Sequence, residues 1–327
     1  MLFVLVVSVV SFLVAFLSIP EFIRKFSDAG IVGRDINKPD KPKLPEMGGL
    51  AVVAGFVAGT LSAIAITTLM HSSLVSDKSF VQFSNLTEIF AAISTILTIT
   101  VIGILDDLIR IRQTIKAALP IFASLPLVAV AAGYPYISLP VLGQLYLPVI
   151  YPLLLIPIAV TVVSNLTNML AGFNGLESGM GLMACLSLGI IALNRGCFDA
   201  AVLLLSMSGA LFAFLLFNKY PARILPGDVG TLSIGACISS SIIIGNFETA
   251  GLLLMTPYLI DFILKARKGF PREIDIISLK NGKLTAPRVV GLPSLIMRLT
   301  GGITERTLVS VLVSLEALLA VLAVLIW

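Results

Sequence analysis

The stretch VIGILDDLIRIRQTIK, residues 101–116, decides the fold. An apolar run ends there at two adjacent acids, Asp106 and Asp107, and three basic residues follow within ten positions. Carboxylates at the end of an apolar helix are costly unless a cation holds them. A divalent metal that carries phosphates would satisfy the acids and the bases together. We therefore expect the other polar segments of the chain to converge on this pair of acids.

The composition is that of a membrane protein. Of 327 residues, 57% are hydrophobic and 12% are charged, and the mean hydropathy is +1.05. A soluble globular protein carries about 25% charged residues. Since a helix needs about 20 apolar residues to cross a bilayer, the chain has room for roughly ten spans and no large soluble domain. We predict an all-α polytopic membrane protein with one integral-membrane domain, residues 1–327.

The apolar segments predict ten transmembrane helices. The first segment lacks the basic start and the cleavage site of a signal peptide, so we interpret it as a span. The ten ranges are approximately 1–22, 47–70, 88–105, 117–133, 146–168, 176–194, 199–217, 228–245, 248–265 and 306–327.

The basic residues predict the orientation. Ten spans put both termini on one side. Of the 22 Lys and Arg residues, 20 fall in the loops of one side and two, Lys78 and Arg195, fall on the other. The positive-inside rule therefore predicts that the long polar loops are cytoplasmic and the termini outside. We expect a cell membrane protein, or one of the endoplasmic reticulum if the source is eukaryotic.

All the distinctive polar motifs lie on the predicted cytoplasmic side. A transporter usually carries polar residues at mid-membrane depth and often an inverted repeat, and neither is visible here. This pattern favours an enzyme with one water-soluble and one lipid substrate. A transporter of a phosphorylated solute or a nucleotide sugar is the alternative. The single histidine, His71, lies in a polar loop, which argues against any mechanism with paired histidines.

The first cytoplasmic motif is DINKPDKPKLPEMGG, residues 35–49. Three X-Pro steps keep it extended, and Gly48 and Gly49 let the next helix begin close to other backbone. Functionally, Lys38 and Lys41 would meet phosphates and Glu46 would meet substrate hydroxyls. The alternative is an ordinary basic loop with lysines reaching the membrane surface.

One of the two acids of the 101–116 stretch would bind the metal, and the other would orient the metal's ligands or act as a base toward the substrate. On a continuous helix Lys116 would lie about 15 Å from Asp106. A turn after Asp107 must therefore bring Lys116 back to the same face. The alternative is that the acids simply end a helix and pair with Arg110.

A third motif, NLTNMLAGFNGLE, spans residues 165–177. Asn165 and Asn168 share a helix face, and Asn174 begins an Asn-Gly turn. Asparagine amides suit a nucleobase, a ribose or a metal-bound oxygen; the alternative is turn chemistry alone. Asp228, just after Gly227, adds a third carboxylate, although an N-cap role would also explain it.

The last polar segment, residues 266–305, is too long for a simple connection and could cover a site. Its candidates for phosphate binding include Arg267, Arg272 and Arg288. For each of them, attraction to anionic lipid headgroups is the alternative.

Three stretches resemble the motifs of the polyprenyl-phosphate N-acetylhexosamine-1-phosphate transferases. They are GILDDLIRIRQTIK, NLTNMLAGFNGLESG and FNKYPARILPGDVGTLSIGA, and the resemblance covers about residues 35–245. The form NMLAGFNGLE resembles the branch that acts on UDP-GlcNAc and dolichyl phosphate in eukaryotes and archaea, whereas bacterial relatives more often carry an acidic DGxDG version.

The resemblance implies a reaction. GlcNAc-1-phosphate passes from UDP-GlcNAc to a polyprenyl phosphate, which gives GlcNAc-diphospho-polyprenol and UMP, the first lipid-linked step of glycan (N-glycan) assembly. Mg²⁺ is the implied cofactor, with Mn²⁺ as an alternative. The same chemistry with another UDP-sugar or with undecaprenyl phosphate stays open. Expected partners are the two substrates and the bilayer, not a nucleic acid, and a homodimer is left open.

The resemblance also implies roles for matched residues. Asp106, Asp107 and Lys116 would be catalytic, with Lys116 holding phosphate and the acids orienting or deprotonating the lipid phosphate, or helping to hold the metal. Asp228 and Asn168 would bind the metal, with Asn168 also near the diphosphate. The substrate-binding candidates are Lys38, Glu46, Asn165, Asn168, Asn174 (for uridine), Arg267, Arg272 and Arg288. The family often carries His in its last cytoplasmic loop; this chain has none there, so an arginine would take its place.

Overall fold

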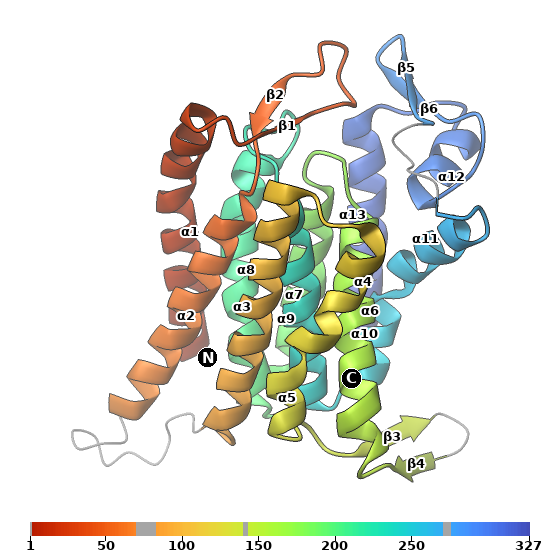
Figure 1. Ribbon diagram of the computed structural model, residues 1–327. Coiled ribbons are helices and arrows are strands. Elements are labelled where there is room, and N and C mark those ends of the chain that lie inside the picture. The colour runs from red at the N-terminus through yellow and green to blue at the C-terminus, as the bar shows by residue number, and fades with distance from the viewer. Residues whose placement is uncertain (1, 70–82, 140–142, 271–275) are drawn as a thin grey trace.

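The computed structural model describes residues 2–69, 83–139, 143–270 and 276–327. The chain forms a bundle of long helices with a short two-stranded sheet at several of its connections (Figure 1). The helices are α1 Leu2–Asp28, α2 Gly49–Leu69, α3 Leu86–Ile109, α4 Gln113–Ala123, α5 Leu125–Ala129, η2 Tyr151–Leu155 (a π-helix), α6 Ile156–Met169, α7 Leu176–Asn194, α8 Phe198–Asn218, α9 Gly227–Gly245, α10 Glu248–Leu254, α11 Thr256–Ala266, α12 Leu292–Leu299 and α13 Glu305–Ile326. The antiparallel strand pairs are β1 Val32–Arg34 with β2 Lys43–Pro45, β3 Tyr136–Leu139 with β4 Gly143–Tyr146, and β5 Ser278–Lys280 with β6 Lys283–Thr285.

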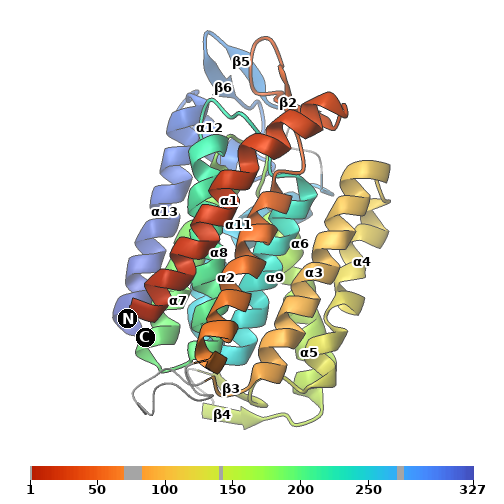
Figure 2. The same cartoon turned by 90° about the vertical axis from the view of Figure 1, so that its left-hand side faces the viewer.

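The molecule is a multi-pass α-helical membrane protein, as predicted. In the described residues, eight helices are long and apolar enough to span, and α10 with α11, bent by 60° between them, makes a ninth if the bent pair is counted as one span. The prediction of a span over 117–133 is corrected. The helical segment here, Gln113–Ala129, is divided into α4 and α5 and is too short to count as a span. Even so, α4 and α5 together carry the chain from one end of the bundle to the other (Figures 1 and 2).

The two ends of the bundle differ in what they carry. Helix α1 begins and α13 finishes at one end, which also holds the β3–β4 hairpin (Figure 1). The opposite end holds the β1–β2 and β5–β6 hairpins, the last turns of α3 and α6 and the first turn of α9; we call it the site end. All the polar motifs of the sequence lie in these segments, so the prediction that they share one face is confirmed for the described residues.

Helix α9 lies in the middle of the bundle, and 89% of its apolar stretch is buried. Glycines on its neighbours let backbone meet backbone at its first turn. A Cβ on Gly49 of α2 would lie 2.2 Å from the Gly230 nitrogen, and one on Gly103 of α3 would lie 2.6 Å from the Val229 nitrogen. Such contacts leave no room for a side chain. The expected close approach at Gly49 is confirmed, and the position of Asp228 on α9 is fixed by it.

Candidate active site

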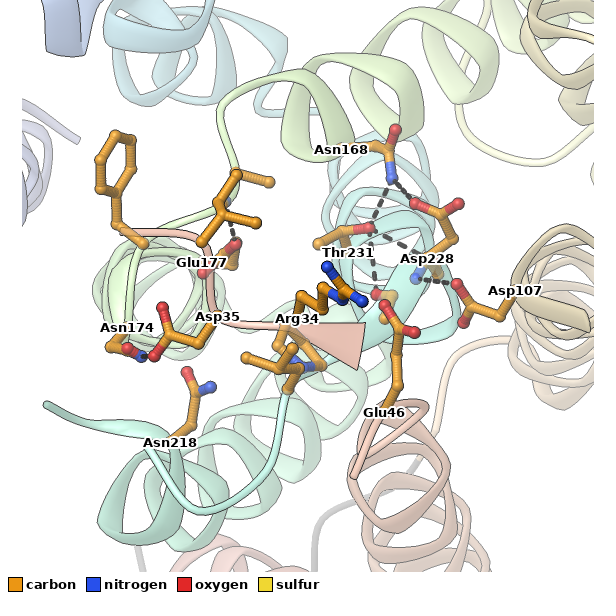
Figure 3. Close-up of a pocket in the computed structure, with 17 residues that line it drawn as sticks. Arg34, Asp35, Glu46, Asp107, Asn168, Asn174, Glu177, Asn218, Asp228 and Thr231 are labelled. Atoms are coloured by element: carbon orange, nitrogen blue, oxygen red, sulfur yellow. Dashed lines mark hydrogen bonds between the residues drawn. The ribbon is translucent and has the colours of Figure 1, made fainter. Parts of the chain in front are cut away.

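A cavity of about 260 Å³ opens at the site end, where segments far apart in the sequence meet (Figure 3). Its walls come from β1, the β2–α2 connection, the end of α3, the turn between α6 and α7, and the start of α9. The lining residues are Arg34, Asp35, Ile36, Glu46, Asp107, Asn168, 171–174, Glu177, Asn218, 225–228 and Thr231.

Lys116 lies between two carboxylates. Helix α3 ends at Ile109, and Arg110 turns the chain with a left-handed φ of 52°. The expected turn is thus present, and it brings the Lys116 Nζ to 2.8 Å from Asp106 Oδ2 and 2.6 Å from Asp228 Oδ2. The other Asp106 oxygen accepts a hydrogen bond from the Ile111 amide at 2.7 Å. Asp106 therefore holds both the turn and the lysine.

Asp107 caps helix α9. Its carboxylate accepts hydrogen bonds from the backbone amides of Asp228 at 2.9 Å and Val229 at 3.2 Å. An acidic group at a helix N-terminus satisfies unpaired amides and complements the helix dipole. The idea that Asp228 caps its own helix is therefore corrected: Asp107 provides the cap, and the Asp228 carboxylate is left to line the cavity.

The second oxygen of Asp228 accepts a hydrogen bond from the Asn168 side chain (Figure 3). The same Asn168 amide nitrogen donates to Thr231 Oγ1 at 2.7 Å, one turn further along α9. Asn168 in the last turn of α6 is thus oriented by two side chains of α9. Asp228 is in contact with Lys116 through one oxygen and with Asn168 through the other.

A second polar cluster, the Lys38 cluster, consists of Asp35, Lys38, Asn174 and Glu305. The Lys38 ammonium forms ion pairs with Glu305 and, at 3.3 Å, with Asp35, and it donates to Asn174 Oδ1 at 3.0 Å. Asn174 donates its side-chain amide to Asp35 Oδ2 at 2.9 Å and its backbone amide to Glu305 Oε1 at 2.8 Å. Two buried carboxylates need a cation beside them. Lys38 is that cation, so its charge neutralises Asp35 and Glu305.

Glu46 faces Asp228 across the cavity (Figure 3). Gly33 makes room for it, because a Cβ on Gly33 would lie 2.9 Å from the Glu46 carboxyl group. Burial raises the pKa of Glu46 above its ordinary value, and the nearby charge of Asp228 raises it further, while Arg110 partly opposes both. Glu46 is thus held close to other negative charge at a cost that depends on pH.

Replacing Glu46 by Gln is expected to stabilise the fold at neutral pH and to change little in acid. The folded protein binds the Glu46 proton more tightly than the unfolded chain does. Stability is therefore lost as pH rises from the ordinary pKa of 4.5 through the raised folded value, and glutamine removes that loss. The test is the thermal midpoint of metal-free protein in detergent at about pH 4 and about pH 8. Equal midpoints for variant and wild type at both pH values would contradict the expectation.

Several predicted site residues lie elsewhere. Asn165 joins α6 to α4, since its amide donates to the carbonyls of Thr161 at 2.8 Å and Ala117 at 3.1 Å. Arg267 and Arg288 are exposed and do not line the cavity. Arg272 lies outside the described residues.

Five polar lining residues were not among the predicted ones. Asp35 and Asn218 lie within quoted motifs, and Thr231 lies three residues after Asp228, a spacing that places both on one helix face. Glu177 accepts a hydrogen bond from the Gly172 amide at 2.6 Å and so fixes the turn before α7. Arg34, in β1, is the only cationic side chain among the described residues that line the cavity.

Comparison with known proteins defines the class to which this arrangement belongs. The model of glycosyl transferase family 4 matches residues 89–246, the segment that carries Asp106, Asn168 and Asp228. A protein of Saccharolobus solfataricus is 37% identical over 322 residues, 96% of this chain and 94% of the relative. The chain belongs to glycosyl transferase family 4, and it is a glycosyl-1-phosphate transferase of the polyprenyl-phosphate N-acetylhexosamine-1-phosphate type.

The names of the relatives are more specific. The Saccharolobus protein is provisionally named a UDP-N-acetylglucosamine–dolichyl-phosphate N-acetylglucosaminephosphotransferase. A Dictyostelium discoideum protein with this name is 29% identical over 336 residues, 89% of this chain and 80% of the relative. A phospho-N-acetylmuramoyl-pentapeptide-transferase of Streptococcus pyogenes is 29% identical over 272 residues, 80% of this chain and 78% of the relative.

Proposed function

We propose that the protein transfers GlcNAc-1-phosphate from UDP-GlcNAc to dolichyl phosphate or a related polyprenyl phosphate and releases UMP. The observation that carries the proposal is the convergence of Asp106, Lys116, Asp228 and Asn168 at the site end, where Asp228 and Asn168 line the cavity. The names of the Saccharolobus and Dictyostelium relatives support the two substrates. The excess of Lys and Arg in the loops of the site end supports a cytoplasmic position for this cavity.

The charges of the cavity support a divalent cation. Of the described residues that line it, five are carboxylates: Asp35, Glu46, Asp107, Glu177 and Asp228. A diphosphate would be repelled by them. In the described part of the chain no three His, Cys, Asp or Glu side chains form a complete metal site. Mg²⁺ at phosphoryl-transfer sites commonly takes one or two carboxylates together with waters and substrate phosphates, and these oxygen donors fit it.

We infer that Asp228 and Asn168 would hold Mg²⁺, or Mn²⁺, which also accepts oxygen ligands. Bound there, the ion would neutralise phosphate charge and help to align the substrates. Lys116 contributes a fixed positive charge beside it. An ammonium group has three donors, and Asp106 and Asp228 engage two of them. In the structure the ammonium is buried behind Asp228 and does not line the cavity, and we infer that its third donor would face a phosphate oxygen of the bound substrate.

The reaction that follows is a direct displacement. An oxygen of the acceptor phosphate attacks the β-phosphorus of UDP-GlcNAc, and the bond from that phosphorus to the UMP oxygen breaks. UMP is a weak base as a leaving group, so no histidine acid is required. Asp106 acts through Lys116, which it positions, and Asp107 acts through the N-terminus of α9. Charge neutralisation and alignment supply the rate enhancement.

The test is UMP release by purified protein given UDP-GlcNAc, a polyprenyl phosphate and Mg²⁺. We expect UMP only when all three are present, loss of activity on chelation with EDTA, and recovery when Mg²⁺ is returned. Lipid product without a metal requirement would contradict the metal assignment. If the protein is active only with another UDP-sugar, that nucleotide sugar and not UDP-GlcNAc is the donor. Solute flux into proteoliposomes with no lipid-linked product would overturn the transferase in favour of a transporter.

A further inference from the structure

We propose that Arg34 binds the diphosphate of the donor nucleotide and is the chain's own phosphate clamp in this cavity. The inference deepens the proposed function and rests on it. The sequence had pointed to Lys38, Lys116 and arginines of residues 266–305 as the residues that bind phosphate. The structure assigns it instead to a residue of the β1–β2 hairpin.

The side chain of Arg34 extends into the cavity. In the view of Figure 3 its guanidinium group projects between Glu46 and Thr231, and these side chains and Asp228 line the same cavity. The side chain is exposed, so a ligand in the cavity can reach it. Within the residues that the structure describes, its guanidinium forms no ion pair or hydrogen bond.

Most of the carboxylates around Arg34 already have partners. Asp228 is engaged by Lys116 and Asn168, and Asp107 by the first amides of α9. Asp35 is engaged by the Lys38 cluster. Because these partners hold the acids in place, the Arg34 charge is left for a ligand. Glu46 remains nearby, and burial and neighbouring negative charge disfavour its ionised form.

The backbone holds Arg34 in register. Arg34 lies opposite Lys43 in the β1–β2 ladder. On one side, Gly33 packs on the Glu46 carboxyl group. On the other, the Asp35 amide donates to the Pro42 carbonyl at 2.9 Å. The guanidinium is therefore carried by a fixed strand, which reduces the entropy lost when it binds a ligand.

Arginine is suited to this ligand. Its planar guanidinium forms paired hydrogen bonds with phosphate oxygens and stays charged at all relevant pH values. Uridine offers no negative charge for it to neutralise. A contribution from Arg34 should therefore appear in the affinity for UDP and be absent from the affinity for uridine.

The experiment compares Arg34→Gln with Lys43→Gln. Lys43 is a matched control because it faces Arg34 across the same hairpin, is exposed, carries the same charge and does not line the cavity. The affinities for UDP and for uridine are measured by calorimetry on purified protein in one detergent with Mg²⁺. We expect Arg34→Gln to weaken UDP binding by about ten- to a hundred-fold, the range for a charged hydrogen bond. Uridine binding should be unchanged, and Lys43→Gln should change neither.

Partial recovery of UDP binding in Arg34→Lys would support the assignment. The proposal is overturned if Arg34→Gln binds UDP as Lys43→Gln does, or if it loses UDP and uridine equally, since that would indicate a structural role. Its failure is separable from failure of the transferase. A wild type that releases no UMP overturns the transferase, whereas the ratio of UDP to uridine affinity decides the role of Arg34.

Discussion

Replacing Asp228 by Asn is expected to lower the rate of UMP release by roughly 10³-fold, as when a fixed group at the reacting charges is lost. Both Asp228 oxygens act as acceptors, one toward the Lys116 ammonium and the other toward the Asn168 amide. An asparagine has one acceptor and one donor, so its NH₂ group must face one of these two donors. The substitution therefore removes a negative charge and disturbs two contacts at once. The measurement is the UMP rate at saturating substrates.

Asp199→Asn is the matched control for this change. Asp199 is also buried, and its carboxylate accepts hydrogen bonds from the amides of Ser84 at 3.0 Å and Asn85 at 2.8 Å. It lies at the start of α8, at the end of the bundle away from the cavity (Figure 1). We expect Asp199→Asn to affect the thermal midpoint and to retain the UMP rate of the folded fraction. More than a tenth of wild-type activity in Asp228→Asn would argue against a central role for this carboxylate.

Replacing Gly227 by Ala is expected to reduce UMP release by about a hundred-fold or more, because misplaced catalytic groups cost this much. Gly227 has a left-handed φ of 67°, which costs an L-residue roughly 1–2 kcal/mol. A Cβ there would also lie 2.5 Å from Asp107 Oδ2 and 3.0 Å from the Met47 nitrogen. The cap that Asp107 places on α9 must then move, and Asp228 must move with it. UMP rate and thermal midpoint are measured together.

Gly301→Ala separates the two causes. Gly301 has nearly the same φ, 66°, and nothing lies within 4 Å of the position of its missing Cβ. It therefore reports the backbone strain alone. We expect Gly301→Ala to lower the thermal midpoint slightly and to leave the UMP rate near wild type. If the two variants lose activity equally, the contact between residue 227 and Asp107 does not hold the site.

Three features could be predicted from the sequence: the class of fold, the position of the polar motifs at one end of the bundle, and the turn that brings Lys116 back to Asp106. Each depends on local information: hydropathy marks the spans, and helix geometry requires a turn between Asp106 and Lys116. The division of residues 117–133 into α4 and α5 was missed, because mean apolar character does not reveal a helix break.

The partners of the site residues could not be predicted. Asp107 contacts Asp228 across 121 positions and Lys38 contacts Glu305 across 267. Spacing in the sequence carries no information on such distances. Residue type also misleads. Lys38 has the right charge to bind a phosphate, but its ammonium forms ion pairs with two buried acids, Asp35 and Glu305. Arg34 drew no attention because its neighbours in the sequence do not mark it, and only the fold directs it into the cavity.

The contact between Lys38 and Glu305 has a consequence for how the protein is made. Glu305 is the first residue of α13, whereas Lys38 lies between α1 and α2. During translation the segment that contains Lys38 leaves the ribosome long before α13 does. Until then the backbone amide of Asn174 lacks its acceptor, Glu305, and Lys38 has only one of its two acids, Asp35. A nascent chain that has inserted every helix before α13 thus contains all the residues that line the cavity. It still lacks Glu305, which holds Asn174 and Lys38 in the Lys38 cluster.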